Sequence, residues 1–312
     1  MAIVRVVCPH YGCRTDISEM RHRPVSQQVE TSMRRTEVKR LTNMMKGAAA
    51  ALAVLLLATP VMAQNQRPAE STIQTVVKRG KLIVGLSTFV PWAIRDKKGD
   101  LIGFEVDVAK QLAKDIGVEL ELVPTAFDGI IPSLLAGKFD LIATGLSITP
   151  KRALTINFSR PYNYSGAMLF ANTKLTAGFK TLDDFNKPGV TLAARRGSTG
   201  AITIQNQFPK ATMRLFDDEQ LANQEVINGN AHAATASPPR PYLLRDKYPN
   251  VISLPFDKAL TRNADAFGIR PGDVDTLSFL DSWVEYNTNN GWLEQRQKYW
   301  FHSTEWSSLV PE

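Results

Sequence analysis

The stretch Gly103-Phe-Glu-Val-Asp-Val-Ala-Lys-Gln-Leu-Ala-Lys-Asp-Ile116 decides the fold of this chain. Its apolar residues from Val108 onward recur at helical spacing and share one face. Two acidic residues stand in the first turn and two lysines follow, an order that complements the helix dipole. Gly117 is a typical helix end. The stretch therefore predicts an amphipathic helix over 104–116 that packs one face against a core.

Strands and helices alternate on both sides of this helix. Such an order predicts an α/β fold with largely parallel strands. The expected elements are strand 81–85, helix 104–116, strand 119–123, helix 128–136 and strand 141–144.

The same pattern recurs further along the chain. In both series a helix end is followed by a glycine, Gly137 or Gly229, and then by a buried strand. Two such units predict two small α/β lobes with a ligand cleft between them, since α/β sheets bind ligands beyond the carboxyl ends of their strands. The second series is strand 190–194, helix 199–208, strand 212–215, helix 218–228 and strand 231–235, followed by helices 273–286 and 292–301.

A leader precedes the first lobe. Lys46 is followed by an apolar run over 48–58, a helix-breaking Pro60 and a small-residue cleavage site that ends at Ala63. This is the layout of a secretory signal peptide over 44–63. The apolar run is too short to span a membrane and no similar run follows, so we expect a soluble exported protein.

The net charge of the chain comes mostly from the residues before the mature protein. The whole sequence carries 37 basic and 30 acidic residues, a formal net charge of +7. Residues 1–63 hold nine of the basic and four of the acidic ones, so the remainder has 28 against 26. This balance does not favour nucleic acid or an anionic membrane as a partner.

Cys8 and Cys13 are the only cysteines, and they flank His10 upstream of the leader. Two thiols and one histidine are an incomplete tetrahedral set, so we expect no metal site. A mature chain that starts at Gln64 would contain no thiol and no disulfide. The cleavage site has no cysteine, which argues against a lipid anchor. We expect a free periplasmic protein.

The sequence Gly-Phe-Glu-Val-Asp-Val-Ala at 103–109 resembles the signature of bacterial periplasmic amino-acid-binding proteins, the receptors of polar amino-acid ABC importers. The resemblance extends from about Ser71 to Trp306. It implies a two-lobed periplasmic-binding-protein (Venus-flytrap) fold with two hinge crossings, near 163–166 and 262–266.

The resemblance also implies the domain boundaries and the partners. Lobe 1 is expected to comprise 64–163 and 266–312, and lobe 2 to comprise 164–265. Two linkers would let the lobes close as rigid bodies over a small-molecule ligand. The implied protein is a monomer that needs no cofactor and delivers its ligand to a membrane permease.

The segment from Thr144 to Arg152 runs from a strand end into a short helix started by Pro150. It offers hydroxyls, backbone N–H groups and a guanidinium, which binds a carboxylate in bidentate fashion. The resemblance implies that Ser147 and Arg152 grip the α-carboxylate of the ligand, and we expect Thr144 and Gly145 to line the same site. The alternative is a capped turn with a solvated arginine.

A second anion cradle is expected in Arg195-Arg-Gly-Ser-Thr-Gly200, which follows a strand and opens a helix. The resemblance implies that Thr199, with Ser198 beside it, closes on the carboxylate from the side opposite Arg152. The loop lacks the Gly-Lys-Ser/Thr ending of a nucleotide P-loop, so ATP is not expected. The alternative is a loop without a ligand role.

Three aromatic residues are expected near the ligand side chain. Phe89 and Trp92 follow a strand, and Phe127 stands at a helix start. The resemblance implies that Phe89 and Phe127 face the ligand, whereas Trp92 matches a residue that is usually packed below the site. Burial without ligand contact is the alternative for all three.

Departures from the family pattern indicate the charge of the ligand. Where many relatives carry an Asp for the α-ammonium, this chain has Ala236 and Ser237, so an ammonium would rely on neutral groups. Arg195 stands where relatives often have an apolar pocket wall. A pocket with Arg152 and Arg195 favours an acidic or neutral ligand over lysine or arginine. The alternative is that Arg195 and Arg196 point to solvent.

A transport receptor without catalytic residues is the preferred interpretation. The alternative is a periplasmic lyase of the cyclohexadienyl dehydratase type, which has the same scaffold. Such a lyase would need a general acid in the second-lobe loop, and the corresponding Gly200 and Ala201 have no ionisable group. An extracellular sensing module is a third interpretation, since similar lobes occur in signalling proteins.

We expect translation to start at Met44 or Met45, with Met33 as the alternative start. Residues 1–43 are then a mis-assigned or disordered extension, and the exported protein begins at Gln64. The reason is that residues 44–47 already supply the short basic region of a signal peptide. N-terminal sequencing or the mass of the exported protein checks this. Mature material that retains residues 1–43 would contradict it.

Overall fold

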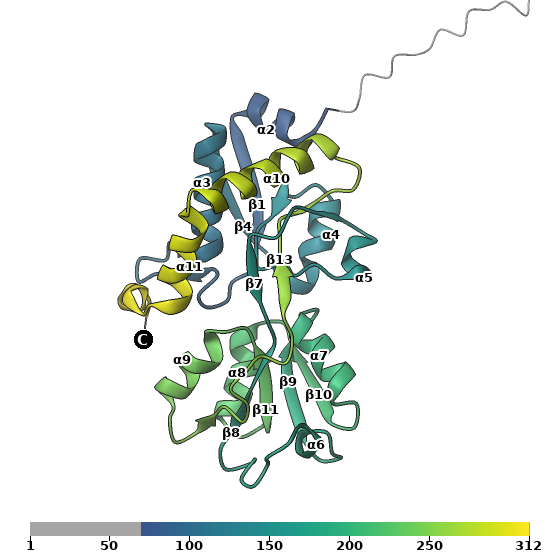
Figure 1. The fold of residues 1–312 in the computed structure, drawn as a ribbon, viewed down its shortest axis with the longest axis vertical. Helices are drawn as coiled ribbons and strands as arrows, with labels where there is room; N and C mark the ends of the chain where they lie inside the picture. Colours follow the sequence, from purple (N-terminus) through teal and green to yellow (C-terminus); the bar gives the residue numbers. More distant parts are fainter. Residues whose placement is uncertain (1–69, 312) are drawn as a thin grey trace, which may run out of the picture. The chain divides into compact units, whose positions relative to one another are not determined.

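The computed structural model describes residues 70–311, which belong to one compact unit, Arg67–Glu312 (Figure 1). The expected extension over 1–43 and the expected signal peptide over 44–63 lie outside the described residues. Within 70–311, no helix combines the length and the apolar character needed to cross a bilayer.

The first sheet has five strands in the order β4-β1-β5-β14-β6. β1 pairs in parallel with β4 and β5, and β14 is antiparallel to β5 and β6. The strands are β1 Lys81–Leu86, β4 Glu119–Pro124, β5 Leu141–Ile142, β6 Asn157–Phe158 and β14 Gly268–Ile269. The helices of this first lobe are α2 Thr72–Arg79, α3 Phe104–Ile116, α4 Ile130–Leu135, α5 Pro150–Ala153, α10 Val274–Asn289 and α11 Trp292–His302.

The second sheet repeats this plan with the order β10-β9-β11-β8-β12. β9 pairs in parallel with β10 and β11, and β8 is antiparallel to β11 and β12. The predicted internal repeat is thus confirmed as two sheets of one topology. The elements of this second lobe are β8 Met168–Asn172, α6 Leu182–Phe185, β9 Thr191–Arg195, α7 Thr199–Gln207, β10 Thr212–Phe216, α8 Glu219–Ile227, β11 Ala233–Ala236, α9 Arg240–Lys247 and β12 Ile252–Ser253.

Two strands connect the lobes, β7 Asn163–Ser165 and β13 Asn263–Asp265, and they pair in antiparallel fashion. Figure 1 shows them side by side between the two sheets. β7 leads into β8 of the second sheet, and β13 leads back to β14 of the first. The chain therefore passes twice between the lobes. The remaining short elements are β2 Ile94–Arg95, β3 Leu101–Ile102, η1 Phe127–Gly129 and η2 Glu305–Leu309.

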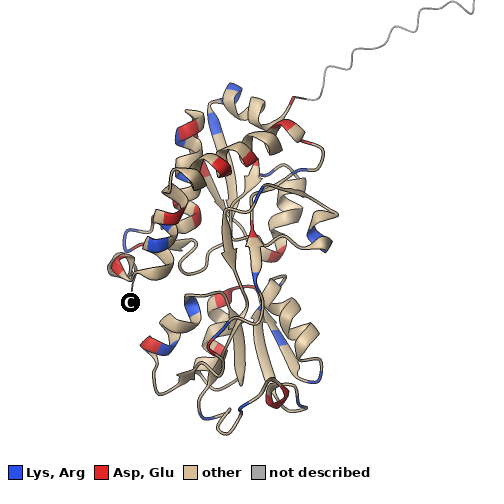
Figure 2. Cartoon of the chain, viewed as in Figure 1, with Lys and Arg blue, Asp and Glu red and all other residues tan. Residues whose placement is uncertain are grey.

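The C-terminal helices complete the core of the first lobe. Trp283 of α10 and Trp300 of α11 are buried, and their indole N–H groups donate to Asp115 and Asp107 of α3 at 2.8 and 2.7 Å. A buried tryptophan needs such a partner for its N–H group. The helix that opens the sequence analysis is therefore bound to the last helices of the chain. The charged residues of α10 are all acidic, whereas α3 and α11 carry both signs (Figure 2).

The helix expected over 104–116 is confirmed without a shift, and Gly117 ends it with φ 79°. The strand expected over 141–144 ends at Ile142. The reason is local, since the hydroxyl of Thr144 bonds the backbone N–H of Ser87 at 2.8 Å and the chain turns away. The antiparallel strands β6, β8, β12 and β14 are not among the predicted elements.

Gly103 should be far less tolerant of substitution than Gly99. Gly103 has φ 137°, and a Cβ atom there would clash with the backbone of Trp92, whereas Gly99 has φ 92° and open space around it. We expect Gly103→Ala to lower the free energy of unfolding by about 3 kcal/mol and Gly99→Ala by about 1 kcal/mol. Urea unfolding of both variants checks this. Equal losses would show that the Trp92 backbone does not constrain the helix start.

Candidate functional site

Residues at and beyond the carboxyl ends of parallel strands in the two sheets meet in one place. Phe89 follows β1, Phe127 follows β4, and Arg195 ends β9. The Cζ atom of Arg195 lies 4.4 Å from the ring centroid of Phe89 and 3.9 Å from that of Phe127. The lobes therefore contact each other at the carboxyl ends of their strands, where α/β sheets bind ligands.

Phe89 and Trp92 form an aromatic wall on the first lobe. Their rings stack with centroids 4.8 Å apart, and Phe301 of α11 packs behind Trp92. Gly145 lies against this wall with φ 57°, and a Cβ atom there would be 3.0 Å from Trp92 Nε1. Trp92 is only 1% exposed, so its contacts support Phe89 from the core side.

Glu105 connects the start of α3 to the loop after β5. Its carboxylate accepts hydrogen bonds from the Gly145 N–H at 2.5 Å and from the Tyr162 hydroxyl at 2.7 Å. Burial raises the pKa of Glu105 to about 8, although both bonds act in the opposite direction. From the sequence, Glu105 is expected only in the first turn of a helix. In the structure its buried carboxyl also accepts a hydrogen bond from Gly145, a predicted site residue.

Arg152 joins the two lobes. Its Nη1 donates to the Ser147 carbonyl at 2.6 Å, and its Nη2 donates to the Gly197 carbonyl of the second lobe at 2.9 Å. Burial lowers its pKa to about 10, and Asp265 partly offsets this. The guanidinium is therefore half-buried and hydrogen-bonded to both lobes, unlike the solvated arginine of the alternative interpretation.

Asp265 connects the Ser147 loop to the strands between the lobes. It accepts hydrogen bonds from the hydroxyls of Ser147 and Ser165 at 2.8 and 3.0 Å and from the Asn163 amide at 3.1 Å. Burial raises the pKa of Asp265 to about 6 against the effect of these bonds. Ser147 is thus coupled directly to β13 and, through Asp265, to β7.

The second-lobe loop begins a capped helix. Ser198 caps α7 through its hydroxyl, and Thr199 Oγ1 accepts a hydrogen bond from the Asn263 amide of β13 at 3.1 Å. A Cβ atom at Gly200 would lie 2.5 Å from Thr235 Oγ1. The loop therefore packs closely on its own sheet and also touches a crossing strand.

Arg195 and Arg196 have opposite environments. Arg195 is 5% exposed, and burial lowers its pKa. The Arg196 side chain is exposed, and its Nε lies 2.9 Å from Asp217 and 3.9 Å from Asp128. The alternative that both arginines point to solvent therefore holds only for Arg196.

Glu219 is a buried carboxyl that the sequence analysis does not identify. It is the first residue of α8, and burial raises its pKa although Arg195 and Arg240 both act to lower it. The acidic pair of Asp218 and Glu219 at a helix start is its only sequence signal. Among the described residues, no carboxylate lies within 4.0 Å of a nitrogen of Arg152, Arg195 or Arg240.

Direct contacts connect most of the predicted residues. Ser237, which follows β11, is half-buried, and its carbonyl accepts the Arg240 N–H at 3.0 Å. In the described part of the chain, no group of three or more His, Cys, Asp or Glu residues could hold a metal ion. The residues connected by the contacts above are Phe89, Trp92, Phe127, Gly145, Ser147, Arg152, Arg195 and Thr199.

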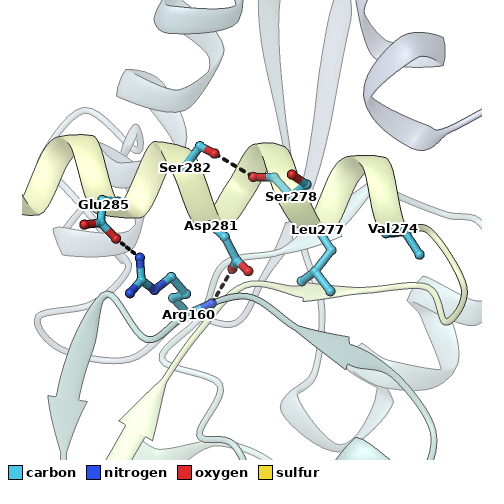
Figure 3. A pocket seen from close by; sticks show the side chains of 7 residues that line it. All are labelled: Arg160, Val274, Leu277, Ser278, Asp281, Ser282 and Glu285. Carbon is cyan, nitrogen blue, oxygen red and sulfur yellow. Dashed lines mark hydrogen bonds and ion pairs between the residues drawn. The ribbon is translucent and has the colours of Figure 1, made fainter.

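A separate hollow of about 400 Å³ lies along α10 and involves none of these residues (Figure 3). The Arg160 N–H donates to Asp281 at 2.6 Å, and the Arg160 side chain pairs with Glu285. Since the backbone N–H of Arg160 is bonded to Asp281 and its guanidinium is paired with Glu285, this hollow offers no free cation for an anionic ligand. We therefore place the candidate site between the lobes.

The family comparison agrees with this architecture. Residues 82–303 match the bacterial extracellular solute-binding proteins, family 3. In solved structures, the chain is similar to a putative binding component of an ABC transporter from Wolinella succinogenes complexed with lysine, with a TM-score of 0.69 and 35% identity over 74% of this chain and 99% of that one.

Two curated relatives differ in their activities. A cyclohexadienyl dehydratase of Pseudomonas aeruginosa is 27% identical over 255 residues, which are 80% of this chain and 92% of the relative. An L-cystine-binding protein of Escherichia coli K12 is 28% identical over 235 residues, which are 74% of this chain and 86% of the relative.

Glu105→Gln should remove part of the pH dependence of stability. The raised pKa of Glu105 means that the folded state holds this proton more firmly than the unfolded chain. The contribution of protonated Glu105 to the free energy of unfolding is complete below pH 4.5 and is lost as the pH rises through about 8. The unfolding free energy of the parent should therefore fall between pH 4.5 and about 8 by a few kcal/mol from this group, and this group should add no further fall at higher pH.

The glutamine variant should show a smaller fall over the same range, because its amide stays neutral, can accept from the Gly145 N–H and can donate to the Tyr162 hydroxyl oxygen. Asp265, with its pKa raised to about 6, acts in the same direction but mostly at lower pH. The exposed Glu119→Gln serves as the matched control and should behave as the parent does. If the unfolding free energy of Glu105→Gln fell with pH as steeply as that of the parent, Glu105 would not be the group responsible.

Proposed function

The chain belongs to the bacterial extracellular solute-binding proteins, family 3, and we propose that it is the periplasmic substrate-binding receptor of an ABC importer. In this proposal an amino acid or related small carboxylate, acidic or neutral, binds between the two lobes. The loaded protein, a monomer, then delivers the ligand to a membrane permease. The receptor itself performs no chemistry.

The observation that carries this proposal is the position of Arg152. Its guanidinium donates to carbonyl groups of both lobes, Ser147 in the first and Gly197 in the second. A planar fork at such a junction can bind a carboxylate with two parallel hydrogen bonds. A ligand carboxylate would therefore replace bonds to protein carbonyls and join the lobes.

The residues around Arg152 support the same proposal. Thr199 stands at the start of α7, where backbone N–H groups and the helix dipole favour an anion. Phe89 and Phe127 add apolar surface to the same junction, while Ser198 and Ser237 offer hydroxyls. The proposed hinge lies in β7 and β13, with the lobe boundaries near 163–166 and 262–266.

A cyclohexadienyl lyase is the second candidate. Two observations favour it: the Pseudomonas aeruginosa relative matches over 92% of its length, and Glu219 is a buried carboxyl whose pKa burial raises. Incubation with cyclohexadienyl carboxylates, followed by detection of the aromatic product, tests it. Turnover that Glu219→Gln abolishes would favour the enzyme over the receptor.

Arg152→Ala should weaken binding of every carboxylate ligand by at least about 30-fold, because it removes one partner of a desolvated charge pair. Calorimetry of the purified protein with a panel of amino acids and dicarboxylates checks this. A ligand at 100 times its dissociation constant should also stabilise the parent by about 2.7 kcal/mol in a thermal shift experiment.

Lys151→Ala is the matched control, since Lys151 is the exposed neighbour of Arg152 in α5. It should bind as the parent does. If Arg152→Ala retains the parent affinity, the assignment of the carboxylate site is wrong.

A further inference from the structure

Arg195 is the most unusual residue of the site because it is a cation inserted between the lobes. Its side chain belongs to the second lobe but lies within 4.4 Å of the Phe89 ring centroid and 3.9 Å of the Phe127 ring centroid, both in the first lobe. It is 5% exposed. The space between two aromatic rings, which could hold a flat or cationic ligand group, is therefore occupied by the protein itself.

The guanidinium of Arg195 lacks hydrogen-bond acceptors. Its Nε and Nη1 are buried and have no partner among residues 70–311. Glu219 and Asp218 are near enough to favour its charged form, but neither lies within 4.0 Å. An arginine side chain carries five N–H donors and remains charged in proteins, so a buried one without acceptors is unfavourable.

The rings of Phe89 and Phe127 compensate only in part for the burial of the Arg195 charge. Cation–π contacts with Phe89 and Phe127 stabilise the charge, and they would also help to hold the lobes together. The N–H donors of a guanidinium lie in its plane, so hydrogen-bond acceptors reach the group along its edge. That edge is the side on which a planar guanidinium binds a carboxylate.

Arg152 lies close to this group. Its Cζ is 5.5 Å from the centroid of the same Phe127 ring, and the charge of Arg195 adds to burial in lowering the pKa of Arg152. A single carboxylate on Arg152 would leave Arg195 unpaired. Two separate anionic groups on one ligand would satisfy both.

Building on the proposed function, we propose that Arg195 binds a second carboxylate of the ligand and thereby makes the receptor selective for small dicarboxylates, acidic amino acids included. The same side chain excludes lysine and arginine, because it fills the space between Phe89 and Phe127 and repels their charge. Arg195 is thus the specificity-determining residue of the site.

The first experiment uses only the parent protein. Calorimetric titration with L-glutamate, L-aspartate and succinate is compared with titration with L-glutamine, L-asparagine, L-lysine and L-arginine. We expect the best dicarboxylate to bind at least about 30-fold more tightly than its amide counterpart, since the amide leaves a buried charge unpaired. Equal affinity for a dicarboxylate and its amide would overturn the inference.

The second experiment uses Arg195→Met, which keeps a long side chain between the rings without charge. It should weaken the best dicarboxylate by at least about 30-fold and change binding of the corresponding amide by less than about threefold. Arg195→Ala should in addition bind lysine or arginine more tightly than the parent, because the space between the rings opens. Arg196→Met is the matched control, since Arg196 is exposed and paired with Asp217.

The outcomes separate this inference from the proposed function. If Arg195→Met weakens all carboxylate ligands equally, Arg195 is not the selective residue, whereas the receptor proposal still stands on Arg152. If the parent binds none of the seven probes, the proposed function fails and the inference fails with it. If the parent prefers lysine or arginine, the inference and the preference for an acidic or neutral ligand fail, whereas the receptor proposal stands.

Discussion

The desolvation of arginine side chains where the lobes meet is the constraint on which the site depends. Arg152 and Arg195 contact the same Phe127 ring, and neither has a carboxylate within 4.0 Å among the described residues. Taking a charge out of water is unfavourable unless hydrogen bonds or a counter-charge compensate for it. Carbonyl groups of both lobes do this for Arg152, while two ring faces do it incompletely for Arg195.

The strands between the lobes belong to the same network. Asp265 of β13 is bonded to Ser147 of the first-lobe loop, and Asn263 of the same strand is bonded to Thr199 of the second-lobe loop. A change at the ligand site would therefore act directly on the residues that connect the lobes. The buried carboxyl of Glu105 adds a second connection, since it holds Gly145 from the side of α3.

Local patterns in the sequence were sufficient to predict one helix and the glycines that end helices. The helix over 104–116 and the glycines that end helices, Gly137 with φ 73° and Gly229 with φ 77°, follow from short-range periodicity and backbone sterics. The antiparallel strands could not be predicted in this way, because β14 pairs with strands more than a hundred residues away. The burial of Arg195 and Glu219 was equally inaccessible, since it arises from partners on distant segments and not from their own neighbours in the chain.

These contacts also explain how a ligand could favour the approach of the lobes. A ligand shifts such an equilibrium only through its differential affinity for the two states. The rings of the first lobe reach Arg195 only where the lobes approach, so the low-dielectric surroundings that strengthen an ion pair with Arg195 exist only in that state. An anion on Arg195 would thus bind the approached state more tightly than the separated one. The cation would be the cause of closure as well as of selectivity, because both effects require the same two aromatic rings.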